Sequence, residues 1–214
     1  MNLSIKWLGH ASFQIKAGGK TVYIDPYEGE YKEKADIILV THSHDDHCNL
    51  SKIKKIRGED TVIIAPEDCA SKIGGNVKTL KPGKETAVGD VTVKAVEAYN
   101  HKRFRSPGKP YHPKGFGVGY LLMAEGKTIY HAGDADFIPE MRQLERVDVA
   151  LLPSGGTYTM DNVEAAEAAI AINPKIVMPM HRWDTNPKQF KDKVEANSEV
   201  KVVILEKSEE YQMA

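Results

Sequence analysis

The chain has 214 residues, 41% of them hydrophobic, which is enough for one compact domain with a hydrophobic core. Its formal net charge of −1 argues against a binder of nucleic acids or other polyanions over its whole surface. The two cysteines, Cys48 and Cys69, argue against a disulfide scaffold, and no apolar run has the length of a membrane span or signal peptide. We therefore expect a single domain over residues 1–214, located in the cytoplasm.

The first part of the chain is predicted to form strands joined by short turns. β-Branched and aromatic residues bounded by glycines mark the early strands, and a fully apolar run marks a strand buried on both faces. The expected strands are Leu3–Leu8, Ser12–Lys16, Thr21–Ile24, Ile37–Val40 and Val62–Ala65. A short helix over Glu67–Ile73 is expected to begin after Pro66 and to end at Gly74.

The second part of the chain is also predicted to form strands, and it includes longer helices. The expected strands are Val91–Ala95, Gly117–Met123, Thr128–Tyr130, Val147–Leu152, Ile176–Met180 and Val200–Leu205. An Ala-rich helix over Asn162–Ile172 has Asp161 as its N-cap, and another helix is expected near Lys188–Glu195. Antiparallel strands followed by strands that alternate with helices indicate an α/β (α+β) fold whose sheets carry helices on their outer faces.

The most informative motif is His42-Ser43-His44-Asp45-Asp46-His47, directly after the apolar strand. Three imidazoles and a carboxylate within six residues suit Zn²⁺, Mn²⁺ or Fe²⁺. The pattern arises by chance on the order of once in a thousand chains of this length. The alternative is a surface loop that binds nothing, but clustered imidazoles at a strand end have little structural purpose without a metal. The motif therefore predicts a metal site.

Two further candidate ligands follow later strands. Asp134 comes after Gly133 at the end of one strand, and His181 follows Met180 at the end of another. Loops at strand ends are common positions for ligands because a rigid sheet holds them. His131 precedes the glycine on the strand side, and we interpret it as structural.

The chain resembles the metallo-β-lactamase fold hydrolases. The matching residues are the motif over 42–47, Gly133-Asp134 and His181. The opening Trp7-Leu8-Gly9-His10-Ala11-Ser12-Phe13, with Ile24-Asp25-Pro26, is similar to a small branch of uncharacterised Zn-dependent hydrolases near the ascorbate-6-phosphate lactonases. The resemblance covers nearly the whole chain. It implies a four-layer αββα sandwich with a dinuclear metal site at one edge.

The resemblance also implies a ligand for each metal. His42 and His44 would bind the first ion, Asp46 and His47 the second, Asp134 would bridge both, and His181 would complete the second site. A bridging carboxylate holds two cations about 3.5–4 Å apart. The implied cofactors are two divalent ions, with zinc expected first and manganese or iron as the other candidates.

A third histidine on the first metal is expected before the strand at 117–123, and two residues compete for it. His112-Pro113-Lys114-Gly115 resembles a His-x-x-Gly pattern that precedes this strand in relatives, so we favour His112. Near relatives have their histidine where this chain has Asn100, and His101 is one residue beyond it. His101 is therefore the alternative, and if neither histidine binds, the first site would be weak and the metal centre mononuclear.

The expected metal site leads to a predicted mechanism. Two divalent ions that share a water lower its pKa toward neutrality, so that hydroxide can attack an ester, lactone or phosphorus centre at pH 7. Asp46 would orient this hydroxide and accept a proton. Cys48, beside the motif, matches no functional position of the family, and we interpret it as a buried thiol.

Substrate residues are predicted from local charge. The segment 102–114 carries five basic residues and no acidic one, and its prolines discourage helix. It is either a solvated surface loop or, if a nearby histidine binds metal, a phosphate-recognition loop. The candidate substrate-binding residues are Arg103, Arg182, next to His181, and His10, which resembles a family position near the metal cleft.

The function expected first is a metal-dependent hydrolase of a small anionic ester, lactone or phosphodiester. The alternatives are a nuclease acting on RNA or single strands, and an iron-dependent redox protein. Against the nuclease, the chain lacks both the inserted domain of such relatives and a basic excess. No nucleic-acid partner is favoured, and a homo-oligomer is compatible with the sequence.

Overall fold

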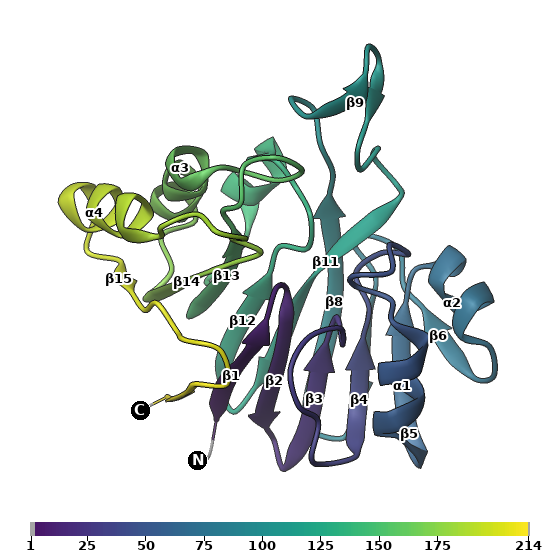
Figure 1. The fold of residues 1–214 in the computed structure, drawn as a ribbon. Coiled ribbons are helices and arrows are strands. Elements are labelled where there is room, and N and C mark those ends of the chain that lie inside the picture. The colour runs from purple at the N-terminus through teal and green to yellow at the C-terminus, as the bar shows by residue number, and fades with distance from the viewer. Residues whose placement is uncertain (1–2, 214) are drawn as a thin grey trace. The chain divides into compact units, whose positions relative to one another are not determined.

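The computed structural model describes residues 3–213, which fold into two compact units. Unit 1 comprises residues 3–95, 122–126 and 205–213, and unit 2 comprises residues 96–121 and 127–204. Within the described residues the strands form two seven-stranded sheets and a separate two-stranded ribbon (Figure 1). None of the helices in this part of the chain has the length and apolar character needed to cross a membrane. The expectation of a single domain stays a prediction.

One sheet lies entirely within unit 1. In spatial order its strands are β16 (Glu210–Gln212), β1 (Ser4–Gly9), β2 (Ser12–Ala17), β3 (Lys20–Ile24), β4 (Ala35–Leu39), β5 (Arg57–Ala65) and β6 (Val77–Thr79). β16, β1, β2 and β3 pair antiparallel, as expected for strands joined by tight turns. β3, β4, β5 and β6 pair parallel. The carboxyl ends of these four strands therefore meet at one edge of the sheet.

Two short helices, α1 (Leu50–Ile56) and α2 (Glu67–Ile73), cover one face of this sheet (Figure 1). Alternate residues of the parallel strands, such as Tyr23, Ile38 and Ile63, form a buried cluster with side chains of both helices. Cys48 and Cys69 are free, buried members of this cluster. The expectation that Cys48 is a buried thiol is confirmed.

Unit 2 is built on a parallel run of strands. In spatial order these are β12 (Lys127–His131), β13 (Val149–Pro153), β14 (Ile176–Met180) and β15 (Lys201–Val202). Helices α3 (Asn162–Ile172) and α4 (Lys188–Asn197) lie against each other and against this run (Figure 1). Ala165 and Ala169 of α3 and Phe190 of α4 are completely buried with strand residues, so the small alanines allow the helix to approach the sheet closely.

The remaining elements complete the two units. They are β7 (Glu85–Val88), β8 (Val91–Ala98), β11 (Gly117–Ala124), the ribbon strands β9 (Phe104–Ser106) and β10 (Lys109–Pro110), and the 3₁₀ helix η1 (Pro139–Gln143). β7 and β8 form an antiparallel hairpin. β8 and β11 each include residues of both units.

The structure confirms most of the expected elements and corrects several. The Asp161 carboxylate accepts hydrogen bonds from the backbone N–H groups of Val163 and Glu164, as its predicted role as N-cap requires. The strand expected over Val200–Leu205 is only Lys201–Val202, since just these residues pair with β14. α1, β16 and the ribbon of the Pro-containing segment were not predicted. Their sequences are short, and β16 has no strand character without its partner β1.

Candidate metal centre

The metal-binding motif begins where the parallel strands of unit 1 end. β3 is followed by Asp25, and β4 is followed by the segment 40–47. The backbone N–H of Asp25 donates to the Leu39 carbonyl oxygen, which ties the two strand ends together. Adjacent parallel strands thus bring a carboxylate and the histidine motif to the same edge of one sheet.

Asp25 is completely buried and organises this edge. Its carboxylate accepts hydrogen bonds from the backbone N–H and the hydroxyl of Thr41, at 2.7 and 2.6 Å. It also accepts one from His47 Nδ1 at 2.8 Å. Because His47 keeps its proton on Nδ1 and donates it to this carboxylate in a hydrogen bond, Nε2 of His47 carries the lone pair that a metal requires.

His42 is oriented in the same way through Thr41. The Thr41 hydroxyl donates its proton to Asp25, so its oxygen accepts from His42 Nδ1, which lies 3.0 Å away. His42 Nε2 then faces His44 Nδ1 at 3.1 Å. The rings of His42 and His47 lie 4.0 Å apart between centroids. Imidazoles that converge, and whose Nδ1 atoms are already hydrogen-bonded, are suited to binding a divalent transition metal through Nε2.

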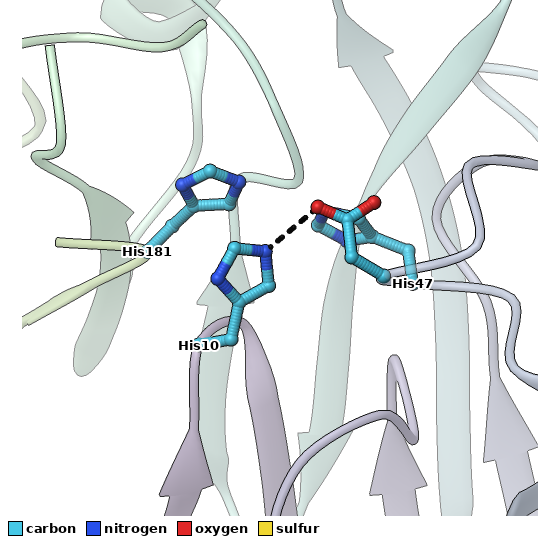
Figure 2. A group of neighbouring side chains, drawn as sticks. His10, His47 and His181 are labelled. Atoms are coloured by element: carbon cyan, nitrogen blue, oxygen red, sulfur yellow. Dashed lines mark hydrogen bonds and ion pairs between the residues drawn. The ribbon is translucent and has the colours of Figure 1, made fainter. Parts of the chain in front are cut away.

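Asp46 lies beside these imidazoles and is bonded to His10. His10 Nε2 donates to Asp46 Oδ2 at 3.1 Å, an interaction marked by the dashed line in Figure 2. His47 Nε2 lies 4.0 Å from the same oxygen. Potential ligand atoms of His10, Asp46 and His47 all lie within 4.8 Å of one another. We call His42, His44, Asp46 and His47 the unit 1 donor set.

His10 is at the turn between β1 and β2, where its φ of 51° is in the left-handed region. Its carbonyl oxygen accepts a hydrogen bond from the indole N–H of Trp7, and its side chain is buried. Residues held in this region cluster at functional sites, because the surrounding structure must offset the strain. The contacts give His10 a role through Asp46, and the substrate contact expected from the sequence stays a prediction.

A second group of candidate ligands lies within unit 2, after the parallel strands β12 and β14. His181 Nε2 lies 3.1 Å from Asp134 Oδ2, and His112 Nε2 lies 3.4 Å from the same oxygen. All three side chains are at most 3% exposed. The backbone φ of His181 is 45°, again in the left-handed region. We call His112, Asp134 and His181 the unit 2 donor set.

Asn100 distinguishes between the two candidates for the third histidine. The Asn100 side-chain oxygen accepts from both the backbone N–H and Nδ1 of His112, at 2.9 and 2.7 Å. His112 Nε2 therefore carries its lone pair toward Asp134. The His101 side chain is 40% exposed, and its Nδ1 lies 4.0 Å from Asp136. These contacts favour His112, and its assignment as a ligand stays a proposal.

Three basic residues of the segment 102–114, Lys102, Arg103 and Lys114, form ion pairs with acidic residues from elsewhere in unit 2. Arg103 forms ion pairs with Asp136 at 2.6 Å and with Glu164 at 2.5 Å, and its Nε donates to the Gly156 carbonyl. Lys102 also pairs with Glu164. Burial opposes ionisation of Asp136, but the Lys102 backbone N–H and the Arg103 guanidinium hold its pKa below the usual range. These contacts favour a structural role for Arg103 over the expected substrate-binding one, which stays a prediction.

Arg182 and His131, two further residues considered in the sequence analysis, are both buried in unit 2. Arg182 is buried at 8% exposure, and its carbonyl oxygen accepts from Thr185. The role of Arg182 in substrate binding stays a prediction. His131 is buried within β12, and its Nδ1 accepts from the backbone N–H of Gly133, which agrees with a structural role.

Three residues that orient the candidate ligands were not assigned to the site from the sequence: Asp25, Thr41 and Asn100. Asp25 was available in the Ile24-Asp25-Pro26 motif that follows a strand. The Asn100 side-chain oxygen accepts a hydrogen bond from Nδ1 of His112. Carboxylate or carbonyl partners of a ligating imidazole are common, so both residues could have been sought by their position at strand ends.

The comparisons with known proteins identify the family. Residues 4–181 match the model of the β-lactamase superfamily domain. The chain belongs to the metallo-β-lactamase superfamily. A UPF0173 metal-dependent hydrolase of Pyrococcus abyssi is 35% identical, with 99% of this chain and 100% of the relative covered. A UPF0173 metal-dependent hydrolase of Pelotomaculum thermopropionicum is 32% identical over 99% of this chain and 100% of the relative.

Solved structures agree with this membership. A Parabacteroides distasonis protein assigned as a metal-dependent hydrolase is 37% identical and superposes with a TM-score of 0.88, over 94% of this chain and 92% of the other. The metallo hydrolase Igni18 of Ignicoccus hospitalis is 25% identical, with a TM-score of 0.82 over 100% and 99% of the two chains. The predicted fold class, a mixed α/β protein with two large sheets, is confirmed. The suggested proximity to ascorbate-6-phosphate lactonases is not confirmed.

Proposed function

We propose that this metal-dependent hydrolase uses two divalent ions to cleave a small anionic ester, lactone or phosphodiester. The observation that carries the proposal is the bonding of the candidate ligands. Internal acceptors receive hydrogen bonds from Nδ1 of His42, His47 and His112, so that Nε2 of each ring is the candidate metal donor. A fold that fixes three imidazoles in the same tautomer is organised for metal binding.

The proposed ligands are the unit 1 and unit 2 donor sets. The family resemblance implies that His42, His44 and His112 would hold one ion and that Asp46, His47 and His181 would hold the other, with Asp134 as a ligand shared by both. Imidazole nitrogens and carboxylate oxygens in this ratio suit zinc first, with manganese and iron as the other candidates. When bound, such ions lower the pKa of a coordinated water and polarise the oxygen on which charge develops.

Asp46 is proposed as the residue that accepts the proton of the attacking water. A third of the Asp46 side chain is exposed, so its carboxylate is accessible to solvent and substrate. The hydrogen bond from His10 Nε2 holds the Asp46 carboxylate in one orientation, as a general base requires. His10 is therefore a positioning residue that acts through Asp46. A cytoplasmic location and a small anionic substrate belong to the same proposal.

Metal content tests the ligand assignment. We expect purified protein to hold close to two divalent ions per chain, measured by plasma mass spectrometry, and Asp134→Ala to lose most of this metal because it removes the bridge. Asp192→Ala, an exposed carboxylate on α4, is the matched control. Full occupancy in Asp134→Ala would contradict the bridging role. Iron with a visible absorption band would contradict zinc.

Turnover tests the role of Asp46. In a screen of phosphodiesters and lactones we expect hydrolysis by the metal-loaded protein, and a fall in kcat of about 10²–10⁴-fold in Asp46→Asn, since an amide cannot accept the proton. Metal content is measured on the same samples. Full activity of Asp46→Asn with unchanged metal would show that the reaction needs no base at this position.

A further inference from the structure

A set of aromatic side chains adjoins the unit 2 donor set. Trp183 is 54% exposed and Tyr158 is 39% exposed, which is unusual for residues of this size. The Trp183 ring lies 5.4 Å from the His181 ring and 6.4 Å from the Tyr158 ring, and Tyr111 continues the series at 4.8 Å from Tyr158. We call Tyr111, Tyr158 and Trp183 the aromatic wall.

The backbone holds Trp183 in this exposed position. Its φ of 46° is in the left-handed region, which is strained for a bulky residue. The turn is fixed by Thr185, whose backbone N–H and hydroxyl both donate to the Arg182 carbonyl. Strain of this kind persists only where the surroundings impose it, and it is concentrated at ligand-binding positions.

Gly155 provides the space for this arrangement. A Cβ atom at this position would lie 2.7 Å from Trp183 Cδ1 and would also collide with the His181 carbonyl oxygen. The Trp183 indole therefore lies close against the Gly155 backbone. The wall is also tied to a candidate ligand, because the Tyr158 carbonyl accepts from Asn100, the residue that holds His112.

We propose that the aromatic wall determines substrate specificity by stacking a flat, aromatic group of the substrate against Trp183 and Tyr158. This inference rests on the proposed hydrolase function, since it places the group beside His181 and Asp134. Aromatic rings stack with a preference for offset or edge-to-face geometry, and the gain is largest where water leaves both surfaces. A fitting substrate therefore has one anionic group, which lies at the proposed metal site, and one aromatic group, which packs against the aromatic wall.

Two phosphodiesters with the same charge and leaving group test the inference: bis(4-nitrophenyl) phosphate and methyl 4-nitrophenyl phosphate. We expect Trp183→Ala to lower kcat/KM for the diaryl ester about tenfold, mainly through KM, and to leave the methyl ester nearly unchanged. Trp183→Phe should retain most of the preference. Phe104→Ala is the matched control, because Phe104 is 44% exposed on the β9–β10 ribbon, outside the wall.

A binding measurement separates this inference from the proposed function. In titration calorimetry we expect diphenyl phosphate to bind about tenfold more tightly than dimethyl phosphate, and Trp183→Ala to abolish the difference. If neither ester is hydrolysed but this difference is found, the hydrolase proposal for phosphodiesters fails and the aromatic wall stands. If the two esters lose activity equally in Trp183→Ala, or the two phosphates bind alike in the unaltered protein, the inference is overturned.

Discussion

At the scale of single residues, Asp25 controls two candidate metal ligands at once. It bonds His47 directly and His42 through the Thr41 hydroxyl. The negative charge of Asp25 keeps both Nδ1 protons in place and raises the basicity of the opposite nitrogens. One buried carboxylate thus couples strand β3 to the histidine motif after β4.

We expect Asp25→Asn to weaken metal binding about 10–100-fold, because the amide keeps the volume but loses the charge. Competition with a chromophoric chelator measures the affinity. Asp36→Asn is the matched control, since Asp36 accepts a backbone N–H at the opposite end of β4 and is partly exposed. Equal affinity in Asp25→Asn and the unaltered protein would show that the charge of Asp25 does not act on the ligands.

Arg103 lies in a buried network of ion pairs. Its side chain is 13% exposed and lies against the carboxylates of Asp136 and Glu164, which are at most 9% exposed. Removing one partner from a buried ion pair leaves the other charge without compensation.

We expect Arg103→Ala to lower the free energy of unfolding by about 3–5 kcal/mol, measured by urea denaturation. Lys102→Ala should cost far less, because Lys102 is mostly exposed. An unchanged unfolding midpoint in Arg103→Ala, together with a raised KM for anionic esters, would instead support the substrate-binding role that the sequence suggested.

At the scale of elements, Asp148 joins three neighbouring strands of unit 2. The residue directly precedes β13, and its carboxylate accepts from the Thr128 backbone N–H of β12 and from Lys175, which precedes β14. Burial opposes ionisation, but Lys175 and the Thr128 N–H hold the pKa of Asp148 below its ordinary value of 3.8.

This depressed pKa predicts a pH dependence of stability. A carboxyl with a lower pKa in the folded state contributes stability above its unfolded pKa and loses that contribution as the pH falls through the folded value. We expect Asp148→Asn to lose about 1–3 kcal/mol at pH 7, and the gap to the unaltered protein to narrow below about pH 4. Thermal unfolding over a pH series measures it. A gap that stays constant to pH 2, or one equally large in Asp192→Asn, would argue against the ion pair.

At the scale of the whole molecule, bound metal should stabilise the fold. An ion that binds only the native state at 100 times its Kd adds about 2.7 kcal/mol to the free energy of unfolding. For a chain of this size we therefore expect chelation to lower Tm by about 5–10 °C, measured by calorimetry. Asp134→Ala should show a much smaller shift. A Tm unaffected by chelator in the unaltered protein would contradict metal binding to the native state.

The sequence by itself determined those features that depend on neighbouring residues. The spacing of His42, His44 and His47 is local, and so are the Asp161 N-cap and the glycine that precedes Asp134. Short-range patterns of this kind are encoded within a few positions, since a strand end or helix start imposes the same geometry in any protein. The family resemblance depends on the same motifs, and the family match confirmed it.

Only the tertiary structure decided which distant residues meet. Asp25 reaches His47 because β3 and β4 pair in register, and Asn100 holds His112 across a loop of 12 positions. Arg103 pairs with Glu164 on α3, 61 positions away, so its charge is compensated by a residue far along the chain. Trp183 is exposed because of a strained turn resting on Gly155. Pairing register and chain packing create these contacts, and no local pattern in the sequence records them.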